Sequence, residues 1–253
     1  MPRPMAEPDD AAPLVTEPLV INMWSGPRNI STALMYSWRE RSDTLVFDEP
    51  FYGHYLSKFD PGHPGMDEIT ATMELDVDKI VASITAPSDR PVRYIKNIGH
   101  HLDALDPSVL GLFTNVLLVR DPVDMVASLT ATIGDEISVD VTGMPQLSQV
   151  LDFELDAGRT PIVVESRRLR NEPVRVLTEL CGRLGLAFDD AMLSWPAGPK
   201  PEDGVWAKHW YDNAHASTEF VPYVPKPAEL NSAQRALADA CQPHYERLLP
   251  FIL

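Results

Sequence analysis

The stretch that decides the fold runs from residue 19 to residue 32 and reads LVINMWSGPRNIST. Its first six residues form a mainly apolar run, which is typical of a parallel strand buried on both faces. The Ser-Gly-Pro that follows predicts a tight turn. Beyond the turn, Ile30, Leu34 and Trp38 recur at a spacing of four residues, which places them on one face of a helix. The stretch therefore predicts a strand, a tight loop and a helix.

The same alternation of strand and helix continues along the chain. Further short apolar segments predict strands at residues 45–47, 92–95, 116–119 and 161–164, and helical patterns appear at residues 122–133, 171–184 and 228–249. Asp121 and Pro122 suit the N-cap and the first position of the first of these helices, at residues 122–133. We therefore expect an α/β fold with a mainly parallel central sheet and helices on both faces.

Three segments lack a clear pattern of this kind. Residues 57–70 and 134–147 are rich in Gly, Pro and Asp, so we expect loops that form the rim of a site. Residues 196–227 contain many prolines and are long for a structureless loop, so we expect them to pack on a site.

The composition limits the classes of protein. The 253 residues carry 21 Lys and Arg against 37 Asp and Glu, so the formal net charge is −16. Such an acidic surface repels phosphate backbones and anionic lipid, which argues against a nucleic-acid or membrane partner. The sequence shows no signal-like or membrane-spanning apolar run, so we expect a cytoplasmic protein. Residues 1–18 are expected to be a flexible tail, and residues 19–253 a single α/β domain.

Two cysteines, Cys181 and Cys241, lie far apart in the sequence. They form neither a disulfide framework nor a metal-spaced cluster, so we expect two buried thiols and no metal. The oligomeric state is left open by the sequence.

Ligands of open α/β sheets bind beyond the carboxyl ends of the strands, so the residues at these positions are candidates for a site. Arg28, Lys96 and Arg120 each follow a predicted strand, and together they would form a local anion site in an acidic protein. In the first loop, backbone N–H groups and the hydroxyls of Ser31 and Thr32 would face a phosphate-like group. This is not a Walker A loop, because its second Gly and its Lys are missing, so magnesium-dependent hydrolysis of a nucleoside triphosphate is disfavoured.

The first loop resembles the phosphosulfate-binding loop of sulfotransferases, commonly P-K-S-G-T-[TS]. Residues 27–32 match it position for position, with Arg28 where the family usually has Lys. Residues 116–128 resemble the family's strand–Arg-[ND]-Pro-x-[DE]-x-x-x-Ser segment, and residues 204–210 have the G-x-W-x-x-H-[FW] spacing of a late loop near the donor's adenosine. Within the family, the sequence is similar to a bacterial and plant branch, some members of which are associated with aminotransferase-like domains.

The resemblance implies a three-layer P-loop NTPase-like fold and transfer of a sulfuryl group from 3′-phosphoadenosine 5′-phosphosulfate to a hydroxyl or amine of a small-molecule acceptor. In this interpretation Arg28 stabilises the leaving oxygen, and Arg120 and Ser128 hold the 3′-phosphate. The expected donor-binding residues are Ser25, Gly26, Pro27, Arg28, Asn29, Ile30, Ser31, Thr32, Arg120, Ser128, Gly204 and Trp206.

The general base has more than one candidate. Glu49 directly follows the second strand, at a position that resembles the catalytic glutamate of bacterial carbohydrate sulfotransferases. His100 and His101 follow the third strand and Lys96, near the place where cytosolic sulfotransferases have a base. The alternative for Glu49 is an ion pair with Arg28 or Lys96 that only organises the loop.

Two other functions stay open at this point. One is a nucleotide-dependent kinase or phosphotransferase, and the other is a nucleotide-binding module without catalysis. Phe51, Tyr52 and Tyr55 near Glu49 suggest a ring-bearing acceptor, although core packing explains them equally well.

Overall fold

The computed structural model describes residues 14–59, 61–225 and 229–253. Its strands are β1 (Leu19–Ser25), β2 (Thr44–Asp48), β3 (Val92–Ile98), β4 (Thr114–Val119) and β5 (Val163–Glu165). The α-helices are α1 (Ser31–Arg39), α2 (Tyr52–Lys58), α3 (Met66–Thr72), α4 (Val77–Ile84), α5 (Pro122–Ile133), α6 (Met144–Asp156), α7 (Ser166–Asn171), α8 (Pro173–Arg183), α9 (Ala207–Trp210), α10 (Asp212–His215) and α11 (Ser232–Leu248). Short 3₁₀ helices are η1 (Gly99–Ala104), η2 (Pro107–Leu112), η3 (Asp140–Thr142), η4 (Asp190–Leu193) and η5 (Leu249–Phe251).

The five strands form one parallel sheet in the order β2-β3-β1-β4-β5. Because β1 lies between β3 and β4, the chain leaves it toward one side of the sheet and later returns to the other side. A crevice forms at such a reversal of strand order, outside the carboxyl ends of the strands. The fold class expected from the sequence is confirmed.

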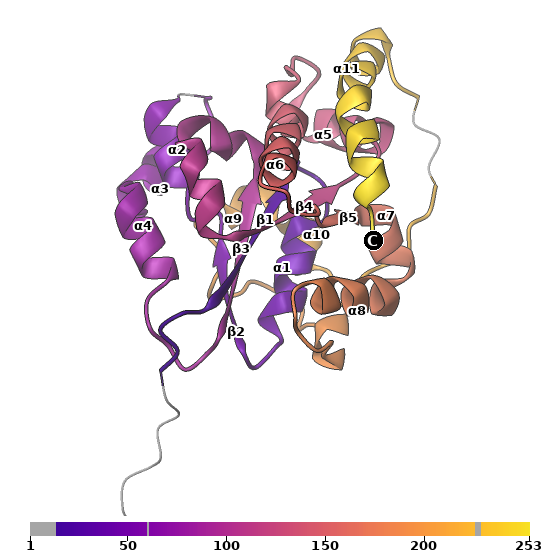
Figure 1. Cartoon of the computed structure of the whole chain (residues 1–253). Coiled ribbons are helices and arrows are strands. Elements are labelled where there is room, and N and C mark those ends of the chain that lie inside the picture. The colour runs from indigo at the N-terminus through magenta and orange to yellow at the C-terminus, as the bar shows by residue number, and fades with distance from the viewer. Residues whose placement is uncertain (1–13, 60, 226–228) are drawn as a thin grey trace, which may run out of the picture.

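The core has two layers, one on each face of the sheet. In β1, Val20 and Trp24 pack into the layer beneath α5, α6 and α11, whereas Ile21 and Met23 pack into the layer beneath α1 and α8. Figure 1 shows these two groups of helices on opposite sides of the sheet. This alternation with a period of two is why a strand buried on both faces appears in the sequence as an apolar run.

The structure also corrects several boundaries. Strand β3 continues through Lys96 to Ile98, so Lys96 lies within the strand and not after it. The expected loop 57–70 includes the start of α3, and the expected loop 134–147 includes η3 and the start of α6. The sequence did not indicate where these helices begin, because the glycine and proline residues near their starts are also common in loops. The segment 196–227 contains α9 and α10.

The structure also bears on the expected N-terminal tail and on the two cysteines. Of the expected tail, residues 1–13 lie outside the described residues, and Val15 forms an isolated antiparallel bridge with Ser88. That residues 19–253 form a single domain stays a prediction. Cys181 and Cys241 are buried free thiols, as expected. Within the described ranges, no helix is long and apolar enough to cross a membrane.

Candidate functional site

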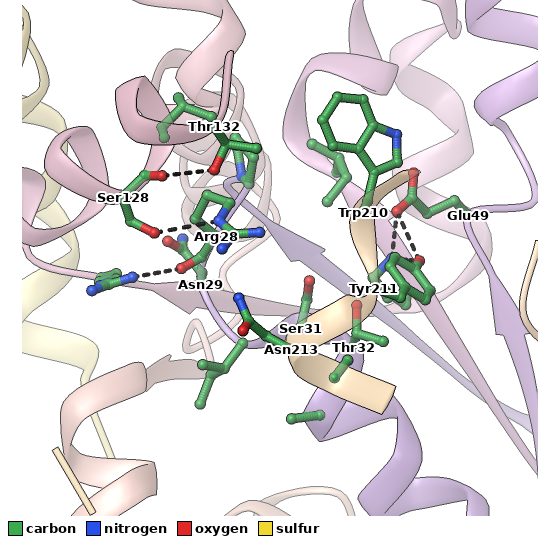
Figure 2. Close-up of a pocket in the computed structure, with 18 of the residues that line it drawn as sticks. Arg28, Asn29, Ser31, Thr32, Glu49, Ser128, Thr132, Trp210, Tyr211 and Asn213 are labelled. Carbon is green, nitrogen blue, oxygen red and sulfur yellow. Dashed lines mark hydrogen bonds and ion pairs between the residues drawn. The ribbon is translucent and has the colours of Figure 1, made fainter. Parts of the chain in front are cut away.

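A cavity of about 600 Å³ lies at the carboxyl ends of the strands. Its walls come from the loop after β1, the ends of β2 and β3, helices α5 and α7, and the segment that contains α9 and α10. Figure 2 shows Arg28, Ser128 and Thr132 on one side of this cavity, and Glu49, Trp210 and Tyr211 on the other. The two ends differ in charge.

The loop between β1 and α1 adopts a strained backbone. Arg28 and Ile30 both have φ near 64°, a left-handed conformation that is unfavourable for a β-branched residue such as Ile30. Ile30 is the N-cap of α1, and no side chain caps this helix, so its first N–H groups lack a side-chain acceptor. Together with the hydroxyls of Ser31 and Thr32, which also line the cavity, these N–H groups are suited to bind an anion.

A close approach of two backbones holds this loop in place. A Cβ atom on Gly26 would lie only 2.7 Å from the carbonyl oxygen of Thr142, at the end of η3. Gly143, the next residue, has φ of 74° and packs against Gly26 and Gly99. Only glycine at residue 26 therefore allows the chain before α6 to close over the loop.

The end of the cavity near α5 is cationic, and we name it the arginine end. Arg28 donates from Nε to Ser128 Oγ at 3.3 Å, and Arg120 donates from Nη1 to the carbonyl oxygen of Arg28 at 2.8 Å. Arg170 of α7 lines the same cavity and donates to the carbonyl oxygens of Val221 and Pro222. No carboxylate within the described residues forms an ion pair with any of these three arginines.

The pKa of Arg120 reflects the cationic character of the arginine end. Burial lowers the pKa of Arg120; the Asp124 carboxylate opposes this shift, and repulsion from Arg170 and Arg28 adds to it. Half-buried cations that form no direct ion pair with a carboxylate favour an anion from outside the chain. This end of the cavity is therefore suited to phosphate or sulfate groups.

The opposite end is built on four residues, Asp48, Glu49, Lys96 and Tyr211, which we name the Lys96 cluster. The Nζ atom of Lys96 lies 2.9 Å from Asp48 Oδ1 and 2.6 Å from Tyr211 Oη, and it also donates to Glu49. Strand register explains the first contact, because Asp48 of β2 lies directly beside Lys96 of β3. Glu49 follows β2 with φ of 47°, which turns its side chain out of the strand and into the cavity wall.

The charges of this cluster stabilise one another. Burial opposes the charge of Lys96, but Asp48 and Glu49 outweigh burial and raise the pKa of Lys96 above its ordinary value. Burial raises the pKa of Asp48; the positive charge of Lys96 opposes this shift, and the nearby Glu49 adds to it. Burial and then the two carboxylates raise the pKa of Tyr211, which therefore keeps its proton.

The expected anion site therefore needs a correction. Lys96 is almost fully buried and is bound by two carboxylates, so it is not a free cation beside Arg28 and Arg120. Arg170 is the third arginine at the cavity instead. It lies in the last turn of α7, after β5, and the topological rule that identified Arg28 and Arg120 could have identified it as well.

The candidate bases lie side by side. His101 Nε2 is 3.6 Å from Glu49 Oε2, and His100 lines the same wall of the cavity. Burial lowers the pKa of both histidines well below the ordinary value, and neighbouring positive or ionisable groups add to this effect. Both rings are therefore neutral at neutral pH, and Glu49 accepts a hydrogen bond from Lys96 beside them.

The sequence patterns did not identify His63 as a site residue. The structure places it on the cavity wall, with its Nδ1 atom 2.8 Å from Tyr52 Oη. Its position depends on packing between α2 and the chain before α3, for which the sequence offers no local signal.

The remaining expected residues divide into two groups. Pro27, Asn29 and Ile30 line the cavity, although Asn29 is fully buried, and their contact with the donor stays a prediction. Ser25 donates to the carbonyl oxygen of Gly26 and is fully buried, and neither residue lines the cavity.

Gly204 and Trp206 were expected beside the donor's adenosine. The Gly204 N–H donates to Asp48 Oδ2 at 3.2 Å, and the Trp206 indole donates to Tyr211 Oη at 3.2 Å. Both residues thus lie at the Lys96 cluster, away from the arginine end, and we assign them to holding this cluster in place.

Within the described part of the chain, no group of three or more His, Cys, Asp and Glu side chains is arranged to hold a metal ion.

Comparisons with known proteins agree with this architecture. Two solved structures share the fold: the sulfotransferase domain from the curacin biosynthetic pathway (TM-score 0.53, 16% identity, covering 90% of this chain and 99% of that one) and a sulfotransferase from Alicyclobacillus acidocaldarius (TM-score 0.52, 15% identity, covering 92% and 95%). At these identities the likeness shows the fold alone.

Two curated relatives from Arabidopsis thaliana are closer in sequence. They are branched-chain-amino-acid aminotransferase-like protein 2 (32% identical over 90% of this chain) and branched-chain-amino-acid aminotransferase-like protein 1 (35% identical over 81%). The chain covers 41% and 37% of their respective lengths. A family model described as "Sulfotransferase domain" matches residues 19–249, and with this match over nearly the whole chain the protein belongs to the sulfotransferase domain family.

Proposed function

We propose that the protein is a sulfotransferase that uses 3′-phosphoadenosine 5′-phosphosulfate and transfers the sulfuryl group to a small-molecule acceptor. One observation carries this proposal: three arginines without carboxylate partners surround an uncapped helix N-terminus, at one end of a cavity whose other end presents a carboxylate. The acidic chain as a whole would not attract such a donor. Its binding would depend on these short-range contacts.

The residues fit the donor's chemistry. The N–H groups at the start of α1, with Ser31 and Thr32, would hold the 5′-phosphate. Arg120 and Ser128 would hold the 3′-phosphate, and Arg170 lies where it adds a further positive charge. Bound there, the donor would supply a sulfuryl group activated by its link to phosphate.

Catalysis would then be a matter of positioning and charge. Arg28 would donate hydrogen bonds to the leaving oxygen as a fixed cation, because a guanidinium does not release a proton at physiological pH. Glu49 would accept the proton of the acceptor hydroxyl, since its carboxylate lines the cavity wall beside Lys96 and His101. Lys96, which is itself held by Tyr211, would hold this carboxylate in place.

Calorimetric titration tests donor binding. Adenosine 3′,5′-bisphosphate should bind, and ATP with magnesium should bind more weakly. Arg120→Ala should weaken the bisphosphate by about 10- to 150-fold, the equivalent of one hydrogen bond to a charged group of about 1.5–3 kcal/mol. Arg175→Ala, at an exposed arginine of α8, is the matched control and should leave the affinity unchanged. Tight ATP binding with no bisphosphate binding would overturn the proposal.

Turnover tests the base. Glu49→Gln should keep the bisphosphate affinity and lose transfer of labelled sulfate to acceptors. If Glu49→Gln turns over normally, then His101, its neighbour at 3.6 Å, becomes the candidate base. Bisphosphate binding by the unaltered protein without transfer to any acceptor in a broad screen would favour a nucleotide-binding module.

A further inference from the structure

We infer that the acceptor is a compact, ring-bearing alcohol without negative charge, and that the Lys96 cluster and its histidine wall exclude anionic acceptors. The inference rests on the proposed function, because it takes the arginine end as the place of the donor. It concerns the other end of the same cavity, where Glu49, Tyr52, His63, His100 and His101 form the wall.

The charge at this end is the first observation. The Lys96 cluster holds two carboxylates and one ammonium, so it carries one net negative charge when both carboxylates are ionised. The cations that line the cavity are Arg28, Arg120 and Arg170 at the other end, and Lys96, which is already bound. Lys208, at the start of α9, is paired with Glu68. An acceptor carboxylate beside Glu49 would therefore meet a like charge and no free cation.

The histidines supply the second observation. His100 Nδ1 and both ring nitrogens of His101 are buried and have no hydrogen-bond partner among the residues that the structure describes. A neutral imidazole offers one N–H donor and one acceptor, which matches the donor and acceptor of a hydroxyl group. Leaving such buried groups unpaired is unfavourable, so a ligand whose hydroxyl group reaches these nitrogens gains affinity.

The aromatic rings supply the third observation. Tyr52 stacks on His101 with ring centroids 4.9 Å apart and an angle of 16° between the planes. His63 lies edge-on to Trp210 at 6.4 Å, and Trp206 lies edge-on to Tyr52 at 5.2 Å. These rings give the end of the cavity flat walls, which suit a planar ring and also tolerate a cation on a ring face.

A matched set of acceptors tests the inference. Benzyl alcohols with a methyl, an aminomethyl or a carboxylate group in the para position share one ring and one hydroxyl and differ in charge. We measure kcat/KM for each, and also the Kd of each for the protein saturated with adenosine 3′,5′-bisphosphate. The carboxylate should be at least about tenfold poorer than the methyl compound in both measurements, and the aminomethyl compound should at least equal the methyl compound.

Two variants separate the effect of charge from the effect of the unpaired histidine nitrogens. Asp48→Asn removes one negative charge beside Lys96, at a residue that does not line the cavity. It should bring the Kd and kcat/KM of the carboxylate compound closer to those of the methyl compound. His101→Phe keeps the ring and its burial but removes the unpaired nitrogens. It should weaken all three compounds to a similar degree and leave their ratios unchanged.

The outcomes distinguish this inference from the proposed function. If the carboxylate compound binds as well as the methyl compound, or none of the three binds, the inference is overturned, and bisphosphate binding by the same protein leaves the proposed donor in place. If the bisphosphate itself does not bind, the proposed function fails. The Kd ratios for the nucleotide-free protein then still decide whether this end of the cavity rejects negative charge.

Discussion

Two fully packed tyrosines should respond in opposite ways to loss of the hydroxyl group. Tyr211 Oη uses its complete hydrogen-bonding capacity: it donates to Asp48 at 2.8 Å and accepts from Lys96 at 2.6 Å and from Trp206 at 3.2 Å. Tyr94, in the middle of β3, is fully buried, and its hydroxyl has no partner among the described residues. The two residues thus offer a matched comparison of the same chemical change.

The magnitudes follow from these contacts. Tyr211→Phe removes hydrogen bonds to charged groups and should lower the free energy of unfolding by about 1.5–3 kcal/mol. Tyr94→Phe removes an unpaired buried hydroxyl, while the ring keeps its stacking on Trp38 at 5.2 Å, so it should raise this free energy by about 1 kcal/mol. For a chain of this size, these changes correspond to a Tm about 3–12 °C lower for the first variant and about 2–4 °C higher for the second.

Urea unfolding followed by fluorescence and circular dichroism measures both variants against the unaltered protein. Equal m-values would show that the extent of unfolding is the same in all three proteins. The reasoning would be refuted if both substitutions shifted the midpoint in the same direction, or if Tyr211→Phe were as stable as the unaltered protein.

Three further predictions concern the loop, the histidine wall and a helix cap. Gly26→Ala should cost about 1–3 kcal/mol of stability and weaken bisphosphate binding, because its Cβ would lie 2.7 Å from the Thr142 carbonyl. Gly182→Ala, in open space on α8, should instead stabilise the protein by about 0.5–1 kcal/mol, and equal effects would contradict this interpretation. Burial lowers the pKa of His101 well below its ordinary value, so the stability that it contributes is complete above about pH 6.5 and falls at lower pH, by up to about 1.4 kcal/mol per pH unit. Urea unfolding between pH 7 and pH 5 should show this loss, and His101→Phe should make the free energy of unfolding depend less steeply on pH. An unchanged pH dependence in the variant would argue that the fold does not keep this histidine neutral. Asp121→Ala removes the acceptor that caps α5 and should cost about 1 kcal/mol in thermal or urea unfolding, whereas no change would mean that the cap is replaced by another group.

Local patterns predicted most of the framework. The segment of β1, its loop and α1 was predictable because an apolar run, a turn and a helical period each leave a signal within a few residues. The cap of α5 was predictable for the same reason, and Asp121 accepts from the N–H groups of Val123 and Asp124 as expected. Short helices such as α3 escaped prediction, because a few turns bounded by glycine resemble a loop.

The location of the candidate site residues was predictable, because the carboxyl ends of parallel strands lie at one edge of the sheet. This rule brought Arg28, Arg120 and Glu49 to the cavity, and all three line it. It did not predict what each charge would meet there, and Lys96 was therefore expected as a free cation.

The sequence by itself thus indicated the alternation of strands and helices, the first loop as a candidate anion site, and a resemblance to the sulfotransferase family. The tertiary structure alone decided the partners of the charges. Tyr211 lies 115 residues from Lys96 and 163 residues from Asp48, yet their side chains are hydrogen-bonded in the folded protein. Whether a lysine binds an anion or is neutralised depends on such distant neighbours and on the loss of water around it, and neither is encoded in the residues next to it.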